Sequence, residues 1–198
     1  LYLDEKVYVS EAQDSLENKK EALKLFTASA EKKNPFASYE LGNMYMRGIG
    51  IEPDVQEAQL HYQNALEQFK KMVGKSTDDS LLYRLGRMYM DGLGTEIDTN
   101  EGEKYIYKAA KLGNESAKLT LSTLYLQKEE EVLHKRAISM LEEMAEKGSA
   151  MAQYKLGAIY TDYEYGYYDL EKAVGYLEAS AEQGNQFAQY KLGVIYSS

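Results

Sequence analysis

The sequence contains no cysteine, 2 histidines and 2 prolines among its 198 residues. Without cysteine the chain forms no disulfide and offers no thiolate for catalysis or metal binding. The two histidines, His61 and His134, are too few for a multi-histidine zinc site. Because proline is scarce and long glycine or serine tracts are missing, the chain is not a low-complexity linker. We therefore expect a folded chain without cofactor or metal, and its cellular compartment stays open.

Long apolar runs and an excess of positive charge are missing as well. No stretch of about 18 apolar residues exists, so we expect no membrane insertion. The formal net charge is -9 and the sequence pI is about 4.9, so the mean field repels phosphate backbones and anionic lipids. Direct binding of nucleic acid by this segment is therefore not expected. With 44% hydrophobic and 28% charged residues, the chain is able to bury a core.

The sequence does contain internal repeats. "LGNMYMRGIG" at residues 41–50 returns as "LGRMYMDGLG" at 85–94. The leucine of this segment recurs at spacings of 44, 36, 35 and 36 residues, as Leu41, Leu85, Leu121, Leu156 and Leu192. A second kind of segment follows each of the first four copies, and an earlier one starts at Asn18. The unit is therefore a segment A followed by a segment B, with a length typical of solenoid repeats.

Both kinds of segment have the periodicity of helices, with apolar or small residues at i, i+3, i+4 and i+8. Asp54, Asp98 and Asn18 begin B segments and are each followed three residues later by glutamate, which predicts capping boxes. Asp169 is expected to cap without such a box, because a lysine holds the third place. Three B segments reach a glycine where a helix needs a left-handed residue to end, at Gly113, Gly148 and Gly184.

Two further sets of glycines need an explanation. A phosphate-binding reading of "RGIG" and "DGLG" would require a preceding strand and a third glycine, and the sequence shows neither. We therefore interpret these paired glycines as the joint between A and B. Another glycine recurs inside the A segments, at Gly42, Gly86, Gly157 and Gly193. Since glycine inside a helix costs about 1 kcal/mol relative to alanine, its recurrence predicts close approach by the partner helix.

The repeat is irregular in two places. In the 44-residue spacing, 5 extra residues are expected to lengthen the second B helix and 3 to lengthen the next loop. The third unit has Ser122 in the glycine position and "QKEEEVLHK" as its connection, and Gly102 replaces a small apolar residue in the second unit. We read "KEEEV" at 128–132 as a solvated loop rather than a metal or basic-peptide site, because adjacent carboxylates repel each other.

The combined motifs resemble Sel1-like repeats, a branch of the tetratricopeptide-type helical repeats. The pattern is A-x-Y-x-L-G-x-x-Y, then G-x-G, then D-x-x-x-A and A-x-x-G-N, as in "AQYKLGAIY" at 152–160 and "SAEQGNQFA" at 180–188. The resemblance implies an all-α, right-handed superhelix of about five helical hairpins. The expected division is a partial repeat at 1–36, repeats at 37–80, 81–116, 117–151 and 152–187, and a truncated repeat at 188–198.

A narrower resemblance concerns "NPFASYELGNMYMRGIG", the lengthened B segment and "DDSLLYRLGRMYMDGLG". They are similar to the repeat tails of conjugative relaxases, the mobilisation proteins of Gram-positive bacteria. "LYLDEKV" at 1–7 is similar to "LYLQKEEEV" at 124–132, which makes Tyr2 the counterpart of Tyr125. Both chain ends then fall at the close of an A segment, so we expect a slice of a longer repeat region.

The A segments also suggest where a partner would bind. A second stripe lies beside the packed face at i, i+4 and i+7, and tetratricopeptide-type repeats use such a face as a concave groove. The residues of this predicted groove are Tyr39, Asn43, Met46, Tyr83, Arg87, Met90, Tyr154 and Tyr190. Aromatic and thioether side chains provide contact area, and polar ones fix register. The alternative is that Tyr39 and Tyr83 only pack between repeats.

The loop "YTDYEYGYYD" at 160–169 is rich in tyrosine. Tyr163, Tyr165, Tyr167 and Tyr168 could form an aromatic patch for peptide binding or self-association. The alternative is that they cover the next hairpin in place of the missing G-x-G. His61 and His134 have no spacing relation to a carboxylate or hydroxyl that suggests catalysis, so packing or exposure is expected for both.

These observations predict a non-catalytic scaffold that holds a peptide or protein partner, or the interaction tail of a larger protein. One alternative is a hydrolase, since some Sel1-like proteins are linked to β-lactams, but those are rich in cysteine and this chain has none. A second alternative is a spacer between domains, with a polar and featureless concave face. The sequence does not determine the partner or the oligomeric state.

Overall fold

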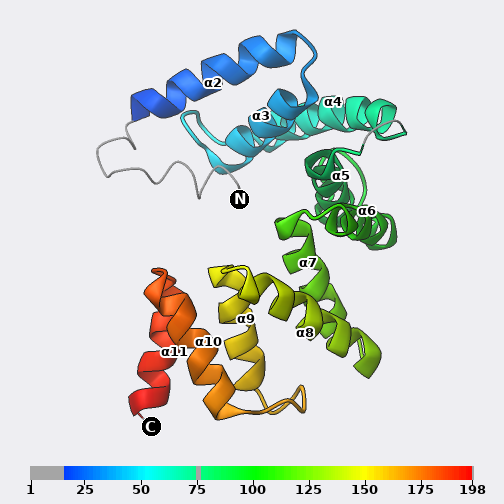
Figure 1. Ribbon diagram of the computed structural model, residues 1–198. Helices are drawn as coiled ribbons and strands as arrows, with labels where there is room; N and C mark the ends of the chain where they lie inside the picture. Colours follow the sequence, from blue (N-terminus) through cyan, green and yellow to red (C-terminus); the bar gives the residue numbers. More distant parts are fainter. Residues whose placement is uncertain (1–15, 75–76, 198) are drawn as a thin grey trace. The chain divides into compact units, whose positions relative to one another are not determined.

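The computed structural model describes residues 16–74 and 77–197, and the regular structure of this part is entirely helical (Figure 1). Its helices are α2 (Leu16–Glu31), α3 (Pro35–Arg47), α4 (Val55–Val73), α5 (Asp79–Asp91), α6 (Thr99–Lys111), α7 (Glu115–Leu126), α8 (Glu131–Glu146), α9 (Ala150–Tyr160), α10 (Leu170–Glu182) and α11 (Gln186–Ser197). The chain forms two compact units, residues 1–105 and 106–198, and each is described by itself. The all-α repeat fold is confirmed. The predicted likeness of Tyr2 to Tyr125 lies outside the described residues.

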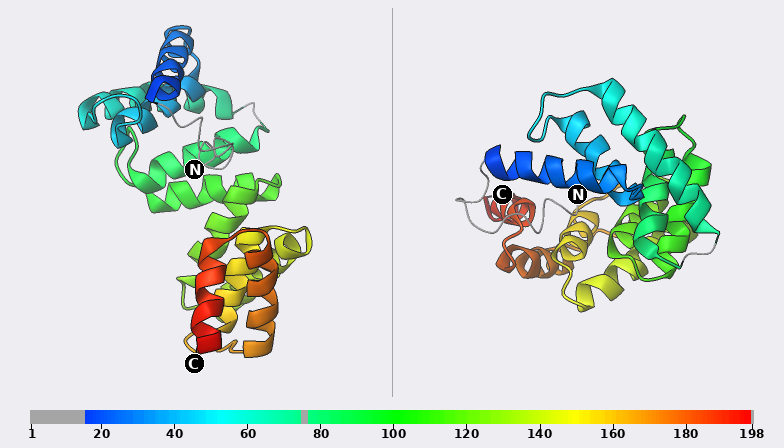
Figure 2. Two further views of the ribbon diagram at one scale, coloured as in Figure 1. Left: turned by 90° about the vertical axis from the view of Figure 1, so that its left-hand side faces the viewer. Right: turned by 90° about the horizontal axis from the view of Figure 1, so that it is seen from above.

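A and B helices alternate along the chain. The A helices are α3, α5, α7, α9 and α11, and the B helices are α2, α4, α6, α8 and α10. Within each unit the packing joins helices that are neighbours in sequence, as in the pairs α3 with α4, α7 with α8 and α9 with α10. At the C-terminal end of the second unit, α11 packs on α10 and also contacts α9 (Figure 2). Within each unit, a hairpin is thus covered by the helix that follows it, as α5 follows α4 and α9 follows α8.

Aspartates begin the B helices as predicted, with one difference in the hydrogen bonds. The Asp54 Oδ1 accepts bonds from the backbone N–H groups of Gln56 and Glu57, at 2.9 and 3.0 Å. A capping box would bring Glu57 back to the Asp54 N–H, but this N–H donates to the Tyr45 carbonyl at 2.9 Å. Asn18 was a wrong prediction, because α2 already runs from Leu16 and Asn18 lies inside it.

Asparagines begin several A helices, which the sequence pattern had not indicated. Asn34 Oδ1 accepts from the N–H of Phe36 at 3.0 Å, and Asn114 Oδ1 accepts from the N–H of Ala117 at 2.8 Å. Asn185 makes the same bond before α11. In the links before α7 and α11, glycine ends one helix and asparagine begins the next, whereas before α3 the left-handed residue is Lys33, with a φ of 62°.

The paired glycines form the joint between A and B, as expected. Gly92 and Gly94 have φ angles of 68° and 71°, and Gly48 and Gly50 have 67° and 74°. The second glycine also lies against the preceding B helix, because a Cβ on Gly94 would be 2.5 Å from the Tyr62 carbonyl carbon. Two separate constraints, backbone conformation and close approach, therefore require glycine here.

The glycine inside the A helix allows the hairpin to close. A Cβ on Gly42 would lie 2.5 Å from Cδ1 of Tyr62, and one on Gly157 would lie 2.5 Å from Cγ of Leu177. Tyr62 and Leu177 are 1% and 0% exposed, so neither can move aside without disturbing the core. The predicted close approach is confirmed for both hairpins. Gly193 differs, because α11 is the last described helix and no B helix follows it there, so a Cβ meets nothing within 4 Å.

Aromatic contacts repeat from hairpin to hairpin. The last tyrosine of the A motif stacks on a B-helix ring in Tyr45–His61, Tyr89–Tyr105 and Tyr160–Tyr176, at centroid distances of 5.3, 5.9 and 5.9 Å. The hydroxyl of the same tyrosine also donates to the preceding B helix. Tyr160 donates to Glu142 at 3.3 Å, and Tyr196 donates to Glu178 at 2.7 Å. This tyrosine therefore links its own hairpin and the previous repeat.

The two irregular places have different outcomes. The lengthening of the second B helix is confirmed, since α4 has 19 residues and α6 and α10 have 13 each. Its additional turns bury Phe69, which packs edge-on against Phe36 at 5.1 Å. The connection of the third unit is shorter than "QKEEEVLHK", because α8 begins at Glu131. The end of the "KEEEV" segment is therefore helical rather than loop, although residues 129–132 are exposed as expected.

We predict that Gly157→Leu destabilises the second unit by roughly 3 kcal/mol, because the new side chain would displace Leu177 from the core. The matched variant is Gly193→Leu at the same repeat position, where the space is open. It should be neutral or stabilising by up to about 1 kcal/mol, since leucine favours a helix more than glycine does. Urea unfolding followed by circular dichroism measures both. Equal losses would contradict the proposed role of the glycine contact.

We also predict that Gly94→Ala costs roughly 3 kcal/mol, because it adds backbone strain and a clash with α4. Gly166 has nearly the same φ of 72°, and a Cβ there meets nothing within 4 Å. Gly166→Ala should therefore show the conformational cost alone, about 1 kcal/mol. Thermal unfolding of the two variants separates the contributions. A larger loss for Gly166→Ala would show that the joint does not depend on close approach.

Candidate functional site

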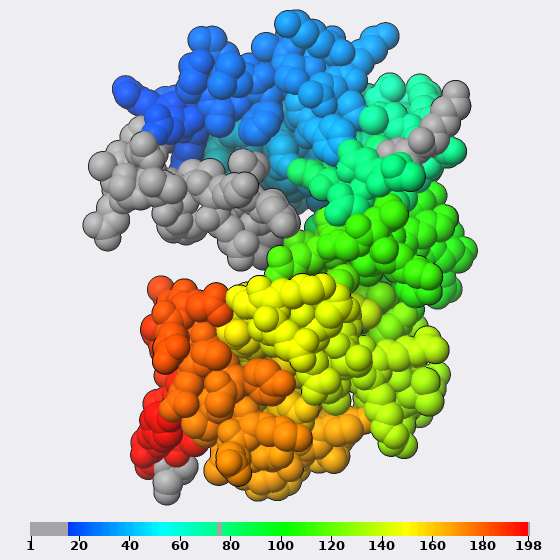
Figure 3. Space-filling view, in the orientation of Figure 1, coloured from blue at the N-terminus to red at the C-terminus, as the bar shows by residue number. Residues whose placement is uncertain are grey.

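The candidate site is the side of the A helices that carries the residue before the motif leucine, and we call it the A face. It consists of the residue before the motif leucine and the residue three positions later. In the first unit these are Glu40, Asn43, Arg84 and Arg87, and in the second unit they are Thr120, Thr123, Lys155, Ala158, Lys191 and Val194. The space-filling view shows part of the α9 surface, in yellow, within the second unit (Figure 3).

In the first unit an ion pair joins the A faces of two repeats. Arg84 Nη2 donates to Glu40 Oε1 at 3.1 Å, and the two side chains are 23% and 13% exposed. Asn43 donates to the other Glu40 oxygen at 2.9 Å and accepts a bond from the Tyr62 hydroxyl at 2.9 Å. The polar groups of this part of the A face are therefore held in fixed positions by their neighbours.

Tyr39 lies within the hairpin packing of the first unit. Its ring meets Tyr62 and Phe69 at centroid distances of 5.7 and 6.5 Å, and the Arg84 guanidinium lies 5.6 Å from it. Burial raises the pKa of the Tyr39 hydroxyl to about 12, and the neighbouring Glu40 carboxylate adds to the rise. These contacts favour the packing alternative for Tyr39 over a role as a free groove residue.

Of the other predicted groove residues in this unit, some are packed and one remains partly exposed. Met46 packs against the core cluster around Tyr62. Met90 fills the space that a side chain on Gly102 would need, which explains the glycine at that position. Arg87 remains partly open, with its side chain 33% exposed and its Nε donating to Asp91 at 2.8 Å. Tyr83 is half-buried and hydrogen-bonded to Arg87.

In the second unit the predicted tyrosines differ in exposure. Tyr154 is half-buried and its ring lies 5.8 Å from that of Phe187, whereas Tyr190 is 73% exposed. Sequence reasoning missed the neighbouring positions, among them Lys155, whose Nζ donates to Thr123 Oγ1 at 2.8 Å. The signal was present in the sequence, because the x of Y-x-L-G varies between charged and neutral residues while its flanking residues repeat.

The tyrosine-rich loop separates into two pairs. Tyr163 and Tyr168 stack on each other at 4.0 Å and are 73% and 42% exposed. Tyr165 packs edge-on against His134 at 5.9 Å, and Tyr165 and Tyr167 both cover the core of the second unit. The loop therefore contains a small exposed tyrosine pair, and its other two tyrosines cover the hairpin as the alternative had suggested.

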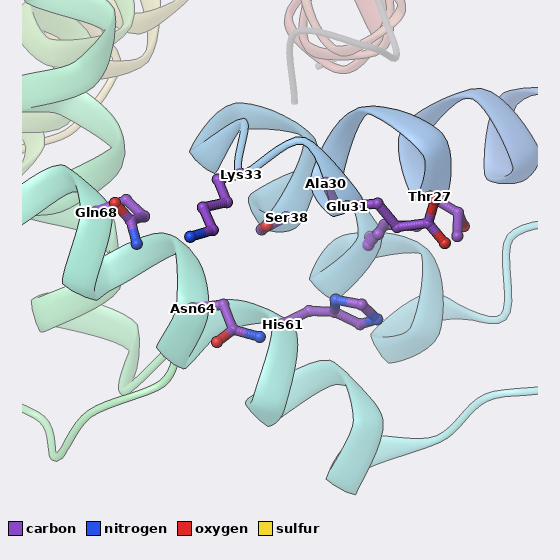
Figure 4. A pocket seen from close by; sticks show the side chains of 9 residues that line it. Thr27, Ala30, Glu31, Lys33, Ser38, His61, Asn64 and Gln68 are labelled. Carbon is purple, nitrogen blue, oxygen red and sulfur yellow. The ribbon is translucent and has the colours of Figure 1, made fainter.

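A hollow of about 360 Å³ lies between α2, α3 and α4 in the first unit (Figure 4). Its lining is mostly polar and includes Thr27, Lys33, Ser38, His61 and Asn64. Burial lowers the pKa of His61, whose ring also stacks on Tyr45. Both lining hydroxyls donate to backbone carbonyls, Thr27 to Leu23 and Ser38 to Asn34. The histidine and the hydroxyls therefore do not form an activated nucleophile.

Two searches of the described residues bear on other kinds of site. No group of three or more potential metal ligands comes together in residues 16–74 and 77–197. In the same part of the chain, every helix is too short or too polar to cross a bilayer.

We predict a pH dependence for Tyr39. Because its folded pKa of about 12 lies above the usual value of 10.0, the stability linked to this phenol is complete below pH 10 and falls as the pH rises towards 12. Tyr39→Phe should show a smaller loss of unfolding free energy across this range, by up to roughly 2 kcal/mol. Urea unfolding of both proteins, compared at neutral and alkaline pH, provides the measurement. Parallel losses in the two proteins would refute the predicted linkage.

Comparison with known families agrees with the geometry. The Sel1 repeat model matches residues 12–34, 35–68, 80–114, 150–185 and 186–198. The matched segments leave out residues 115–149, where Ser122 and the short connection depart from the pattern. A search of curated proteins finds no significant match.

Solved structures of similar fold come from several bacteria. A Sel1 repeat protein from Oxalobacter formigenes is 29% identical with a TM-score of 0.64, over 91% of this chain and 71% of that one. The protective antigen c5321 of uropathogenic Escherichia coli, which has an SLR fold, is 27% identical with a TM-score of 0.60, over 89% and 36%. The immunity protein Pa5087 from Pseudomonas aeruginosa is 25% identical with a TM-score of 0.53, over 84% and 59%. This chain thus spans less than two thirds of the latter two proteins. On the family match, it belongs to the Sel1 repeat family.

Proposed function

We propose that this chain is a non-catalytic scaffold that holds an extended segment of a partner protein on its A face. Sel1 repeat proteins are generally protein-interaction scaffolds. The observation that supports this proposal most is the fixed network of Glu40, Asn43 and Arg84, which orders polar groups on adjacent A helices. A partner that binds such a surface loses less side-chain entropy on the scaffold side, because the groups are already in place.

Arg87 supplies the open hydrogen-bond donors of this surface. Its guanidinium is held against Asp91 through Nε and one Nη, yet the side chain remains 33% exposed. An arginine in this state can donate its remaining N–H groups to a carbonyl or carboxylate of a partner. Arginine is also among the residues that contribute most often to binding energy at protein interfaces.

The two alternatives account for less of the structure. A spacer predicts a polar, featureless face, whereas the A-helix surface of the second unit exposes Met151, Phe187 and Val194 at 36%, 65% and 50%. A hydrolase needs an activated nucleophile, and the hydroxyls lining the hollow between α2 and α4 already donate to main-chain carbonyls. An interaction scaffold therefore accounts best for the ordered polar groups of the first unit and for the exposed apolar residues of the second unit.

The relaxase likeness is a separate proposal about the protein from which these repeats come. It is supported by the segments around 34–50 and 78–94 and by the lengthened α4 between them. Inspection of the neighbouring reading frame provides the test. A relaxase domain encoded upstream would support the proposal, and an unrelated domain in that place would refute it.

We predict that a random peptide library displayed on phage yields binders to the chain, and that Arg87→Ala weakens them about tenfold or more. Fluorescence anisotropy with the selected peptides gives the affinities. The matched control is Lys104→Ala on the B helix α6, because Lys104 also forms an intrahelical ion pair, with Glu101 at 2.8 Å. This control should change affinity less than twofold. Failure to select any peptide, or equal effects of the two substitutions, would argue against binding at the A face.

A further inference from the structure

The cation before the motif leucine has a charge partner in the first unit. Arg84 of α5 meets Glu40 of α3, which holds the same place one repeat earlier, at 3.1 Å. In the second unit the corresponding cation is Lys155 of α9, and the same place one repeat earlier is Thr120 of α7. The repeat therefore brings a cation to a position where its counter-charge has been replaced by a neutral side chain.

Lys155 is half-buried, and its hydrogen bond is to a neutral group. Its Nζ donates to Thr123 Oγ1 at 2.8 Å, and this hydroxyl donates onward to the Leu119 carbonyl at 3.0 Å. Burial lowers the pKa of Lys155, and within residues 16–74 and 77–197 no carboxylate counters this effect. An ammonium that is partly removed from water without an opposing charge is destabilising.

Exposed apolar side chains lie on α9 and α11 at matching repeat positions, near Lys155 and Lys191 in sequence. Met151 lies one turn before Lys155 on α9, and Phe187 lies one turn before Lys191 on α11. Val194 follows Lys191 by three residues. The exposed fractions of Met151, Phe187 and Val194 are 36%, 65% and 50%. The A face of α9 and α11 thus combines two lysines with exposed apolar surface.

The rest of the second unit uses its charges differently. Lys118 pairs with Glu143 at 3.2 Å, and Lys147 pairs with the same carboxylate at 2.6 Å. Glu142 and Glu178 accept bonds from the tyrosines that link the repeats. In a chain with a formal net charge of -9, cations facing an apolar surface are complementary to an acidic partner.

We infer that the surface formed by Met151, Lys155, Phe187, Lys191 and Val194 binds an extended acidic segment of another protein. Carboxylates of that segment pair with Lys155 and Lys191, and its apolar side chains cover Met151, Phe187 and Val194. The inference rests on the proposed scaffold function, because it names the class of partner for the same face.

The repeat also fixes the spacing of the acidic residues. α9 and α11 contact each other, and packed helices have axes about 8–10 Å apart. An extended chain in the polyproline II conformation advances about 3.1 Å per residue with three residues per turn, so side chains three residues apart point the same way. Carboxylates three residues apart therefore match lysines at the same place on these two helices. Acidic residues at every third position, with apolar residues between them, describe the expected ligand.

The test uses a fluorescein-labelled ten-residue peptide with glutamate at every third position and leucine or phenylalanine between, and a copy with glutamine for each glutamate. Fluorescence anisotropy with the whole chain should show at least tenfold tighter binding of the glutamate peptide, weakening with added salt. Lys155→Met combined with Lys191→Met should remove this preference. Lys135→Met is the matched control, since this lysine of α8 is 64% exposed and lies on a B helix. It should change affinity less than twofold.

Stability measurements separate a binding role of Lys155 from a structural one. If the lysine serves a ligand, Lys155→Met should keep or raise the urea midpoint, because it removes a partly desolvated charge. A clear fall in the midpoint, or equal affinity for the glutamate and glutamine peptides, would overturn the inference. Peptides from the phage library that respond to Arg87→Ala would in that case leave the scaffold proposal standing. If neither the library nor the glutamate peptide binds, both proposals fail.

Discussion

The contact between a glycine of the A helix and a large side chain of the B helix determines how each hairpin is built. Gly42 beneath Tyr62 and Gly157 beneath Leu177 bring the two backbones closer than any other residue would allow. The close pair leaves part of its apolar surface uncovered, and the next A helix covers that part. Tyr160 shows the coupling, because it stacks on Tyr176 of its own hairpin and donates to Glu142 of the previous one. The glycine side of the A helix is taken up by this packing, and the residues of the A face lie beside it.

Features that depend on short stretches of chain could be predicted from the sequence. The turn glycines, the aspartate caps and the longer α4 each follow from a local pattern. The errors arose where a local signal competed with another. At Asn18 a good capping residue lies inside a helix that starts earlier, and at Glu131 a run of acidic residues continues into α8. Acidic residues are favourable in the first turn of a helix, so the "KEEEV" segment was compatible with both readings.

The candidate site depended on contacts between repeats, which periodicity alone does not give. The spacing of Tyr39 was compatible with a groove or with packing between repeats, and the additional turns of α4 bring Phe69 beside it, which favours packing. Tyr154 likewise packs against another ring, that of Phe187. The contacts of the neighbouring residues, Glu40 in the first unit and Lys155 in the second, are made with the adjacent A helix, so they required the structure. In a repeat protein, positions that vary while their neighbours stay constant are candidates for contacts outside the repeated core, and here these are the x positions of Y-x-L-G.

The charges at the residue before the motif leucine distinguish contacts that stabilise the fold from side chains that the fold does not need. Glu40 and Arg84 show that this fold accommodates an ion pair between successive A helices. The chain has 32 acidic and 23 basic residues, so carboxylates are the commoner charge. Folding alone would be served at position 120 by a carboxylate facing Lys155, or at position 155 by an apolar residue of similar length. Thr120 and Lys155 provide neither a counter-charge nor an apolar contact. The exposed Met151 and Phe187 add apolar surface whose contact with water is unfavourable. A carboxylate supplied from outside the chain, on a segment with apolar side chains, satisfies both deficits at once.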